Sequence, residues 1–218
     1  MSIYYQDEFV TLYHGDCLEQ TAWLDADVLV TDPPYGMAYV SNRSKYGSSA
    51  PIAGDKDLGI RDCTLETWGD KPALVFGTWR LARPASARHL LVWDKGNDPG
   101  TGDLSMPWGN SSEEIYVIGK GWTGKRGPNV LRVRGYANTS ADRPNHPTPK
   151  PVSLMEQLIA KCPHGVIADP FAGSGSTLVA AVNQGRKAIG VEYEERYCEL
   201  IAKRLSNQTG ALDLGLTA

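Results

Sequence analysis

The chain of 218 residues lacks the features of secreted, membrane-spanning and metal-binding proteins. Neither Lys nor Arg occurs in the first 42 residues, which argues against a secretory signal peptide, and no apolar stretch approaches the length of a membrane span. The four cysteines are scattered without C-x-x-C spacing, and the four histidines form no ligand pattern beside them. We therefore expect a protein of the reducing cytoplasm, with no disulfide, no metal and no membrane partner.

Apolar runs alternate with helical patterns along the chain, which is long enough for one domain, 1–218, with a sizeable core. The patterns predict strands at Val10–Tyr13, Val28–Thr31, Ala73–Phe76, His89–Trp93, Ile115–Ile118, Val166–Ala168 and Ala188–Glu192. They predict helices near Pro151–Lys161, Thr177–Asn183 and Glu195–Leu205, loops at Ser41–Asp62 and Asn97–Asn110, and a fraying end at Ser206–Ala218. This order predicts an α/β fold with a mostly parallel central sheet flanked by helices, and with ligands at the carboxyl ends of the strands.

The segment Asp32–Tyr35 (Asp-Pro-Pro-Tyr) directly follows the predicted strand Val28–Thr31. Two consecutive prolines stop the strand in a stiff, non-helical turn. The turn holds a carboxylate, two backbone carbonyls and a phenol ring together. That set suits a planar base with an exocyclic amino group, because carboxylate and carbonyl accept from the NH₂ while the ring stacks on the base. A strand terminator with a surface tyrosine is the alternative.

A second motif, Asp169–Thr177, is a glycine-rich turn between the predicted strand Val166–Ala168 and an apolar helix. It lacks the Gly-Lys-Ser/Thr of a Walker A loop, and Leu178 stands where the third glycine of a dinucleotide fingerprint would be. Glu192 ends the next strand, about 20 residues beyond the loop, where an acid normally holds a ribose diol. An ordinary tight turn is again the alternative.

The charges around this loop indicate the kind of ligand. Neither Lys nor Arg lies between Gly165 and Gly185, while Asp169 and Glu192 flank the loop. A di- or triphosphate would meet carboxylates without a local cation, whereas a ligand with a ribose and positive charge would be attracted. S-adenosylmethionine, with its sulfonium and ammonium groups, fits that description.

Taken together, these motifs resemble those of amino-group DNA methyltransferases of the N6-adenine or N4-cytosine type, in the permuted order with the catalytic motif before the cofactor motif. The resemblance covers nearly the whole chain. The matching segments are Leu12–Glu19, Thr31–Gly36, Leu91–Gly96, Glu113–Ile118, His146–Pro151, Asp169–Thr177, and Gly190–Glu192 with Tyr197.

The resemblance implies a Rossmann-like, S-adenosylmethionine-dependent methyltransferase fold and direct methyl transfer to a flipped base. The catalytic residues that it implies are Asp32, Pro33, Pro34 and Tyr35, with Tyr35 stacked on the base and with Asp32 and the Pro33 carbonyl accepting the amino hydrogens. The cofactor-binding residues that it implies are Asp16, Cys17, Asp32, His146, Thr148, Lys150, Asp169, Pro170, Phe171, Ala172, Gly173, Ser174, Gly175, Ser176, Thr177 and Glu192.

The net charge of −3 hides an asymmetry along the chain. Residues 1–42 carry seven acids, whereas residues 119–150 carry seven Lys and Arg against a single Asp, with Trp122 and Tyr136 among them. A solvated surface would account for this, but interleaved aromatic side chains favour contact with double-stranded DNA. The residues we expect to contact DNA are Arg43, Lys45, Lys120, Lys125, Arg126, Arg132 and Arg134.

Residues 95–145 form the candidate target-recognition region, which is small for reading a sequence by direct contacts. Either this compact region recognises a short DNA sequence, or a homodimer or another partner supplies additional recognition surface. A lone compact methylase is typical of restriction–modification systems, phages and other mobile elements.

Within the resembled family, Asp at the first position of the catalytic motif tends to accompany adenine and Ser tends to accompany cytosine. Asp32 therefore favours N6 of adenine, with N4 of cytosine as the alternative. Two alternatives belong to other functional classes. One is a methyltransferase that acts on RNA or on a protein amide, and the other is a non-catalytic cofactor-binding module.

Overall fold

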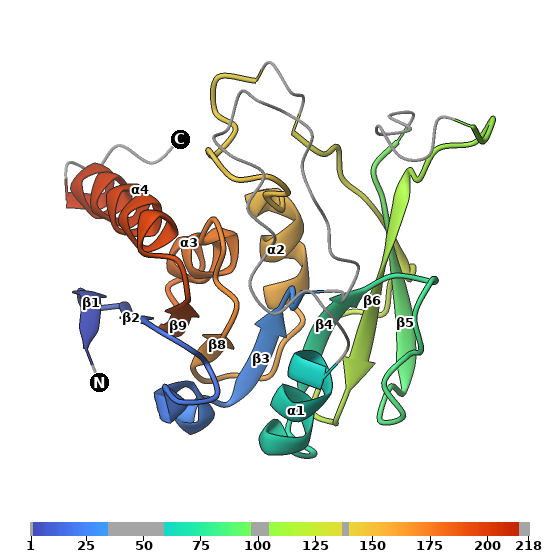
Figure 1. Cartoon of the computed structure of the whole chain (residues 1–218), viewed down its shortest axis with the longest axis horizontal. Helices are drawn as coiled ribbons and strands as arrows, with labels where there is room; N and C mark the ends of the chain where they lie inside the picture. Colours follow the sequence, from blue (N-terminus) through green and yellow to red (C-terminus); the bar gives the residue numbers. More distant parts are fainter. Residues whose placement is uncertain (1, 35–58, 97–104, 137–139, 214–218) are drawn as a thin grey trace.

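The computed structural model of the chain describes residues 2–34, 59–96, 105–136 and 140–213, with side chains as far as residue 208. Within these residues a nine-stranded sheet crosses the molecule in the order β1-β2-β9-β8-β3-β4-β6-β5-β7. Helices cover both faces of the sheet (Figure 1). The architecture is the mostly parallel α/β sheet that the sequence predicts.

The strands are β1 (Ile3–Gln6), β2 (Val10–His14), β3 (Val28–Thr31), β4 (Ala73–Gly77), β5 (His89–Asp94), β6 (Ser112–Ile118), β7 (Val130–Arg132), β8 (Ile167–Asp169) and β9 (Ala188–Glu192). The helices are α1 (Gly59–Trp68), α2 (Val152–Ile159), α3 (Ser176–Asn183) and α4 (Glu195–Asp213), with a 3-10 helix, η1 (Thr21–Asp25).

Strand directions decide which chain segments can meet at a site. The strands β2, β9, β8, β3 and β4 run parallel to one another. Next to them, β6 runs antiparallel to both β4 and β5, so β5 points the same way as β4. The carboxyl ends of β3, β4, β5, β8 and β9 therefore share one edge of the sheet with the beginning of β6.

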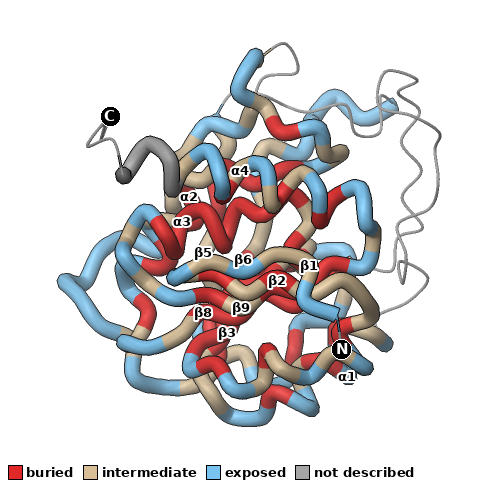
Figure 2. The backbone as a smooth tube through the Cα atoms, turned by 90° about the vertical axis from the view of Figure 1, so that its left-hand side faces the viewer, coloured by how far each residue is buried: buried red, intermediate tan, exposed pale blue. Residues whose placement is uncertain are grey.

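Alternate strand residues pack on opposite faces of the sheet, as the pleat requires. Val28 and Val30 face a cluster that includes Leu154 of α2 and Ile201 of α4. Leu29, between them, faces a second cluster that contains Trp23 of η1 and Trp68 of α1. Figure 2 shows these buried strands lying between the helical layers. Both faces of β3 are covered, which is why its sequence reads as a continuous apolar run.

All seven predicted strands and all three predicted helices are present, and their bounds agree within three residues except at the end of α4. That helix continues to Asp213, where the sequence led us to expect fraying from Ser206. The side chain of Gln208 donates a 2.5 Å hydrogen bond to Oδ1 of Asn183, which ties the extension to α3. Once α4 is held against α3 by this contact, each further residue that joins the helix adds one backbone hydrogen bond, which favours its extension beyond Ser206.

Some elements were not predicted: β1, β7, η1 and α1. The helix α1 begins at Gly59, inside the expected loop Ser41–Asp62, and the rest of that loop lies outside the described residues. Its buried side chains are Arg61, Thr64 and Trp68, and only Ile60 and Leu65 pack beside Trp68 on the core, so its apolar face is too sparse to stand out in the sequence. In the described part of the chain, no helix has the length and apolarity needed to cross a membrane.

Candidate active site

A pocket of about 800 Å³ opens at the edge of the sheet where the parallel strands end, a size within the usual range for small-molecule sites. Its wall includes the ends of β3, β4, β8 and β9 and the beginning of β6. Of the residues expected at the site, those in the wall are Asp16, Cys17, Asp32, Pro33, Pro34, His146, Thr148, Lys150, Asp169, Pro170, Phe171, Ala172, Gly173, Ser174, Ser176, Thr177 and Glu192. Tyr35 lies outside the described residues.

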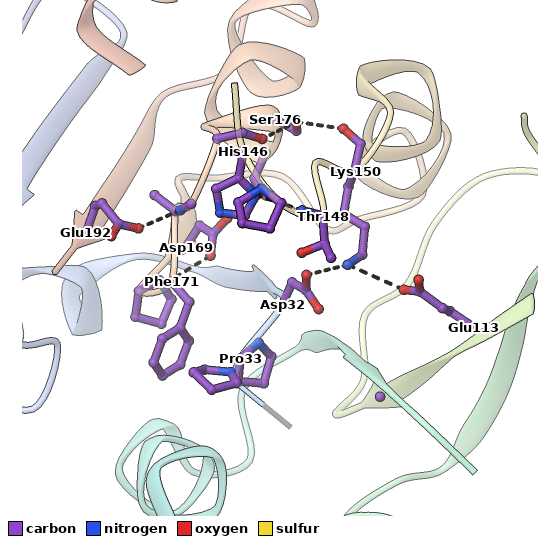
Figure 3. A pocket seen from close by; sticks show the side chains of 18 of the residues that line it. Asp32, Pro33, Glu113, His146, Thr148, Lys150, Asp169, Phe171, Ser176 and Glu192 are labelled. Atoms are coloured by element: carbon purple, nitrogen blue, oxygen red, sulfur yellow. Dashed lines mark hydrogen bonds and ion pairs between the residues drawn. The ribbon is translucent and has the colours of Figure 1, made fainter. Parts of the chain in front are cut away.

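On one side of the pocket, Asp32 follows β3 and meets Lys150, which precedes α2. The ammonium of Lys150 donates a hydrogen bond to Oδ2 of Asp32 and lies 3.3 Å from Oε2 of Glu113 (Figure 3). Burial alone would lower the pKa of Lys150, but the two carboxylates outweigh it and raise this pKa above its usual value. Lys150 is therefore a charged ammonium despite its burial.

Glu113 is itself held between two cations. Its Oε1 lies 2.6 Å from Nζ of Lys95, the residue that follows β5. Burial alone would raise the pKa of Glu113, but Lys150 and Lys95 together lower it below its usual value. The sequence motifs contain both Lys95 and Glu113, yet neither was expected at the site, because their meeting depends on the pairing of β5 with β6.

The glycine-rich turn forms the other side of the pocket. Oδ1 of Asp169, at the end of β8, accepts a 2.7 Å hydrogen bond from Oγ1 of Thr31 and one of 3.2 Å from the backbone N–H of Phe171. Ser176, the first residue of α3, donates a 2.7 Å hydrogen bond from Oγ to the backbone carbonyl of Lys150. These bonds fix the turn to β3 and to the segment that carries Lys150.

Glu192, at the end of β9, reaches under the same turn. Its Oε2 accepts a 2.7 Å hydrogen bond from the backbone N–H of Gly173, and its Oε1 accepts one of 2.8 Å from Glu194. Burial nevertheless raises the pKa of Glu192 to about 7 and the pKa of Asp169 to about 6. Two buried carboxyl groups that resist ionisation would gain from a cationic ligand beside them.

His146 packs at the glycine-rich turn as a neutral ring. Burial lowers its pKa to about 3, with the charges of Lys150 and Arg143 acting in the same direction. Its ring contacts that of Tyr197 edge to face with centroids 4.6 Å apart, and its Nδ1 accepts a 3.3 Å hydrogen bond from the backbone N–H of Thr148. The imidazole therefore shapes the wall and does not carry protons at neutral pH.

Further residues of the wall were missed by the sequence reading, among them Trp79 and Arg80, which come shortly after β4. The Trp79 side chain is large, apolar and 69% exposed, and Cζ of Arg80 lies 5.5 Å from its ring centroid. A tryptophan next to an arginine just beyond the carboxyl end of a buried strand was the available signal, because ligands of such sheets bind at those strand ends.

The Lys- and Arg-rich residues 119–150 divide between the two edges of the sheet. Because β6 is antiparallel to β4, Ile118 pairs with Ala73 at the start of β4, and the chain that follows Ile118 is at the edge opposite the pocket. Lys120, Lys125 and Arg126 belong to that segment. The chain then returns along β7 to Arg132, which pairs with Asp94 at the pocket edge.

Of the other basic residues expected to contact DNA, Arg132 and Arg134 lie near the pocket. Nε of Arg132 lies 3.4 Å from Oδ2 of Asp94, and Arg134 follows two residues later, so both are near the edge that holds the pocket. Arg43 and Lys45 lie outside the described residues. The five described residues of this set therefore divide between opposite edges of the sheet. Among the described residues, no group of three or more His, Cys, Asp or Glu is arranged to hold a metal ion.

Comparison with known proteins agrees with this geometry. Residues 83–204 match the family model described as DNA methylase of the N6/N4 type. The chain is 38% identical to the type II methyltransferase M.ScaI of Streptomyces caespitosus, in an alignment that covers 96% of this chain and 85% of that one.

Two solved structures are similar in fold. The M1.HpyAVI–SAM complex superposes with a TM-score of 0.66 at 22% identity, covering 90% of this chain and 98% of that one. The cytosine-N4-specific PvuII DNA methyltransferase superposes with a TM-score of 0.68 at 16% identity, covering 93% and 88%. On the evidence of the family model and of M.ScaI, the chain belongs to the N6/N4 family of DNA methylases and is a DNA amino-methyltransferase.

Proposed function

We propose that this protein transfers a methyl group from S-adenosylmethionine to N6 of adenine in double-stranded DNA. The observation that carries the proposal is a single pocket whose wall contains both Asp32, with the prolines after it, and the glycine-rich turn with Glu192. The two strands that end in these motifs, β3 and β8, are adjacent in the sheet. A methyl donor on one motif would then meet an amino group on the other without any large movement of the chain.

The residues around the glycine-rich turn fit S-adenosylmethionine. Glu192 and Asp169 are buried carboxyls with raised pKa values, so a cationic ligand with ribose hydroxyls would stabilise their charged forms. We assign the ribose to Glu192, and to His146 and Phe171 a role in closing the pocket around the ligand. The cofactor supplies an activated methyl group on a sulfonium. The protein's task is then to exclude water and align the two reactants.

On the target side, the Asp32 carboxylate and the Pro33 carbonyl accept hydrogen bonds from the amino group of an extruded base, and Tyr35 stacks on its face. The amino nitrogen gains positive charge as the methyl group arrives. Acceptors that bind it more tightly in that state than before it lower the barrier. Direct transfer of this kind requires no metal and no covalent nucleophile.

The choice of adenine rests on Asp32. In related sequences Asp at this place tends to accompany adenine, and this chain has Asp. Cytosine N4 is the second candidate, favoured by the similar fold of the cytosine-N4-specific PvuII enzyme. The two amino groups are chemically alike, so the family tendency, and not the physics of the site, supports adenine.

For the DNA we assign contacts to the pocket edge. Trp79 is exposed beside the pocket, where it can stack on a base or fill the gap that a flipped nucleotide leaves. Arg132 and Arg134 are on the same edge and suit phosphate contacts. Residues 95–145 remain the candidate recognition region, and of its described residues the start of β6 and the end of β7 lie at this edge, while the segment after Ile118 lies at the other.

The test is nucleoside mass spectrometry of unmethylated duplex DNA after incubation with the purified protein and S-adenosylmethionine. N6-methyladenine is the expected product. N4-methylcytosine would replace the base assignment and keep the chemistry. Absence of any methylated nucleoside, while calorimetry still detects cofactor binding, would reject DNA as the acceptor under these conditions and favour RNA, a protein amide or a non-catalytic role.

A further inference from the structure

Four charged side chains of alternating sign run along the target side of the pocket. They are Asp32, Lys150, Glu113 and Lys95, and all four contribute to the pocket wall. Lys150 bonds to Asp32 and lies 3.3 Å from Oε2 of Glu113, while Lys95 lies 2.6 Å from Oε1 of Glu113. The formal charges sum to zero, although the residues come from four separate stretches of the sequence.

A contribution to folding stability does not explain why these four charged side chains are together. The side chain of Lys150 is only 8% exposed, that of Glu113 is 21% exposed, and removing such ions from water costs more than their mutual attraction usually returns. Apolar residues of similar volume would fold at least as well in many such places. Asp32, by contrast, is 25% exposed toward a pocket, so the ion pairs end on a group that a ligand can reach.

We propose that Lys150 and Glu113 are positioning residues for Asp32, with Lys150 holding its carboxylate in a fixed orientation and Glu113 cancelling the charge of Lys150. The inference rests on the proposed function, in which Asp32 accepts from the target amino group. Lys150 then acts on the target base through Asp32. This role differs from the direct contact with the cofactor that the sequence led us to expect for Lys150. Ser176, whose Oγ binds the backbone carbonyl of Lys150, connects this arrangement to the cofactor side.

Glu113 offsets the positive charge that Lys150 places beside Asp32. A cation beside Asp32, taken alone, would weaken the attraction between Asp32 and an amino nitrogen that becomes positive during transfer. With Glu113 present, the cluster is neutral overall and Asp32 keeps its pull on that nitrogen. Lys95, on the far side of Glu113, keeps the second carboxylate charged.

Other titratable groups near Asp32 determine what happens when Lys150 is removed. Asp169 lies close enough that the charge of Asp32 adds to the raised pKa of Asp169, although burial is the larger cause. His146 stays neutral and cannot replace the lost cation. Without Lys150, Glu113 loses the larger of the two cationic influences that lower its pKa. The cation that contacts both Asp32 and Glu113 would then no longer offset the repulsion between their carboxylates.

The decisive variants are Lys150→Met, Glu113→Gln and the double variant with both. In single-turnover methylation at pH 8 and saturating cofactor we expect Lys150→Met to lose about 100-fold in rate, because the acceptor is misplaced. The double variant also lacks the second carboxylate facing Asp32 from β6, so it should be faster than Lys150→Met. Lys150→Arg, which keeps the charge, should retain more activity than Lys150→Met.

Calorimetric binding of S-adenosylmethionine and thermal unfolding, measured on each variant, separate this role from a structural one. We expect cofactor affinity within a few-fold of wild type. A double variant no faster than Lys150→Met, or a Lys150→Arg variant no faster than Lys150→Met, would reduce the pair to a structural tie and overturn the inference.

A readout independent of turnover is the ¹³C chemical shift of the Asp32 carboxyl at pH 8. This chemical shift should move in Lys150→Met and lie closer to the wild-type value in Lys150→Arg. If the wild type methylates nothing, the proposed function fails, but the chemical shift still decides whether Lys150 positions the Asp32 carboxylate. An unchanged chemical shift in Lys150→Met would overturn the inference on its own.

Discussion

The backbone N–H of Gly173 donates a 2.7 Å hydrogen bond to Oε2 of Glu192, so the glycine-rich turn after β8 is tied directly to the end of β9. The two strands lie side by side and in parallel, with Asp169 paired to Gly190. A carboxyl group that both anchors the turn and faces the pocket can report on ligand binding through its protonation.

Binding of S-adenosylmethionine should weaken as the pH falls through about 7. Burial raises the pKa of Glu192 to about 7, so the group is a carboxylate above that pH and becomes a neutral acid below it. The neutral acid attracts a cation less and offers fewer acceptors to ribose hydroxyls. Between pH 8 and pH 6 we expect the dissociation constant to rise about tenfold, because with a pKa of about 7 the ionised fraction of Glu192 falls about tenfold over this range. Isothermal titration calorimetry across this range measures it.

Glu192→Gln is the matched control, because it keeps the shape and removes the titration. It should bind the cofactor more weakly at pH 8 and lose the step near pH 7. Asp169, with a pKa raised to about 6, should then account for any change that remains at the acid end. An identical pH dependence in wild type and Glu192→Gln would assign the titration to another group.

The two main motifs were predictable because each is encoded locally. Two prolines after an apolar run stop a strand at Asp32, and glycines after Asp169 turn the chain into α3, whatever the rest of the sequence does. In a parallel sheet both turns emerge at the same edge, so their meeting followed from the fold class. The position of Glu192 followed in the same way from β9.

Contacts that depend on the antiparallel part of the sheet were not predictable. Glu113 faces Lys150 because β6 begins at the pocket edge, and Lys95 joins them because β5 ends there. The same reversal sends Lys120 and its neighbours to the opposite edge, although in the sequence they look continuous with Arg132. Linear proximity of basic residues carries no information about which end of a strand they occupy.

Replacement of Asp32 should abolish transfer while cofactor binding largely survives. Removing one preorganised group that stabilises developing charge typically costs about 10² to 10³ in rate. Asp32→Asn is the better first variant, because its amide oxygen can still accept a hydrogen bond from the buried Lys150, whereas Asp32→Ala removes the acceptor together with the charge. Single-turnover methylation and calorimetry measure the two effects, and Tyr35→Ala is expected to behave like Asp32→Asn. Turnover retained by both Asp32 variants would reject the assigned mechanism.

Gly175→Ala should destabilise the fold at the cofactor side. Gly175 has a φ of +77°, and an added Cβ would lie 2.8 Å from Cγ1 of Ile201 on α4. Left-handed strain and overpacking together should lower the free energy of unfolding by about 2–4 kcal/mol, measured by urea denaturation. Gly185→Ala is the control, since Gly185 has a φ of +64° with nothing within 4 Å of its added Cβ, and only the strain of about 1 kcal/mol applies. Equal losses in both variants would show that Ile201 moves aside.

Trp79→Ala should weaken DNA binding without changing cofactor binding. The indole is 69% exposed and belongs to the pocket wall, so stacking on a base is its most favourable use. Loss of one such stack costs about 1–3 kcal/mol in measured cases. Fluorescence anisotropy with a labelled duplex, in the presence of an unreactive cofactor analogue, measures the change.

Trp108→Ala supplies the comparison for that measurement. Trp108 is 78% exposed, but the described wall of the pocket is formed by other residues. A general apolar contribution to DNA affinity would lower binding equally in both variants, whereas a base stacked at the pocket depends on Trp79 alone. The distinction sharpens if the duplex carries an abasic site at the target position. Trp79 should then still favour binding if it fills the gap in the duplex, and should lose its effect if it stacks on the extruded base.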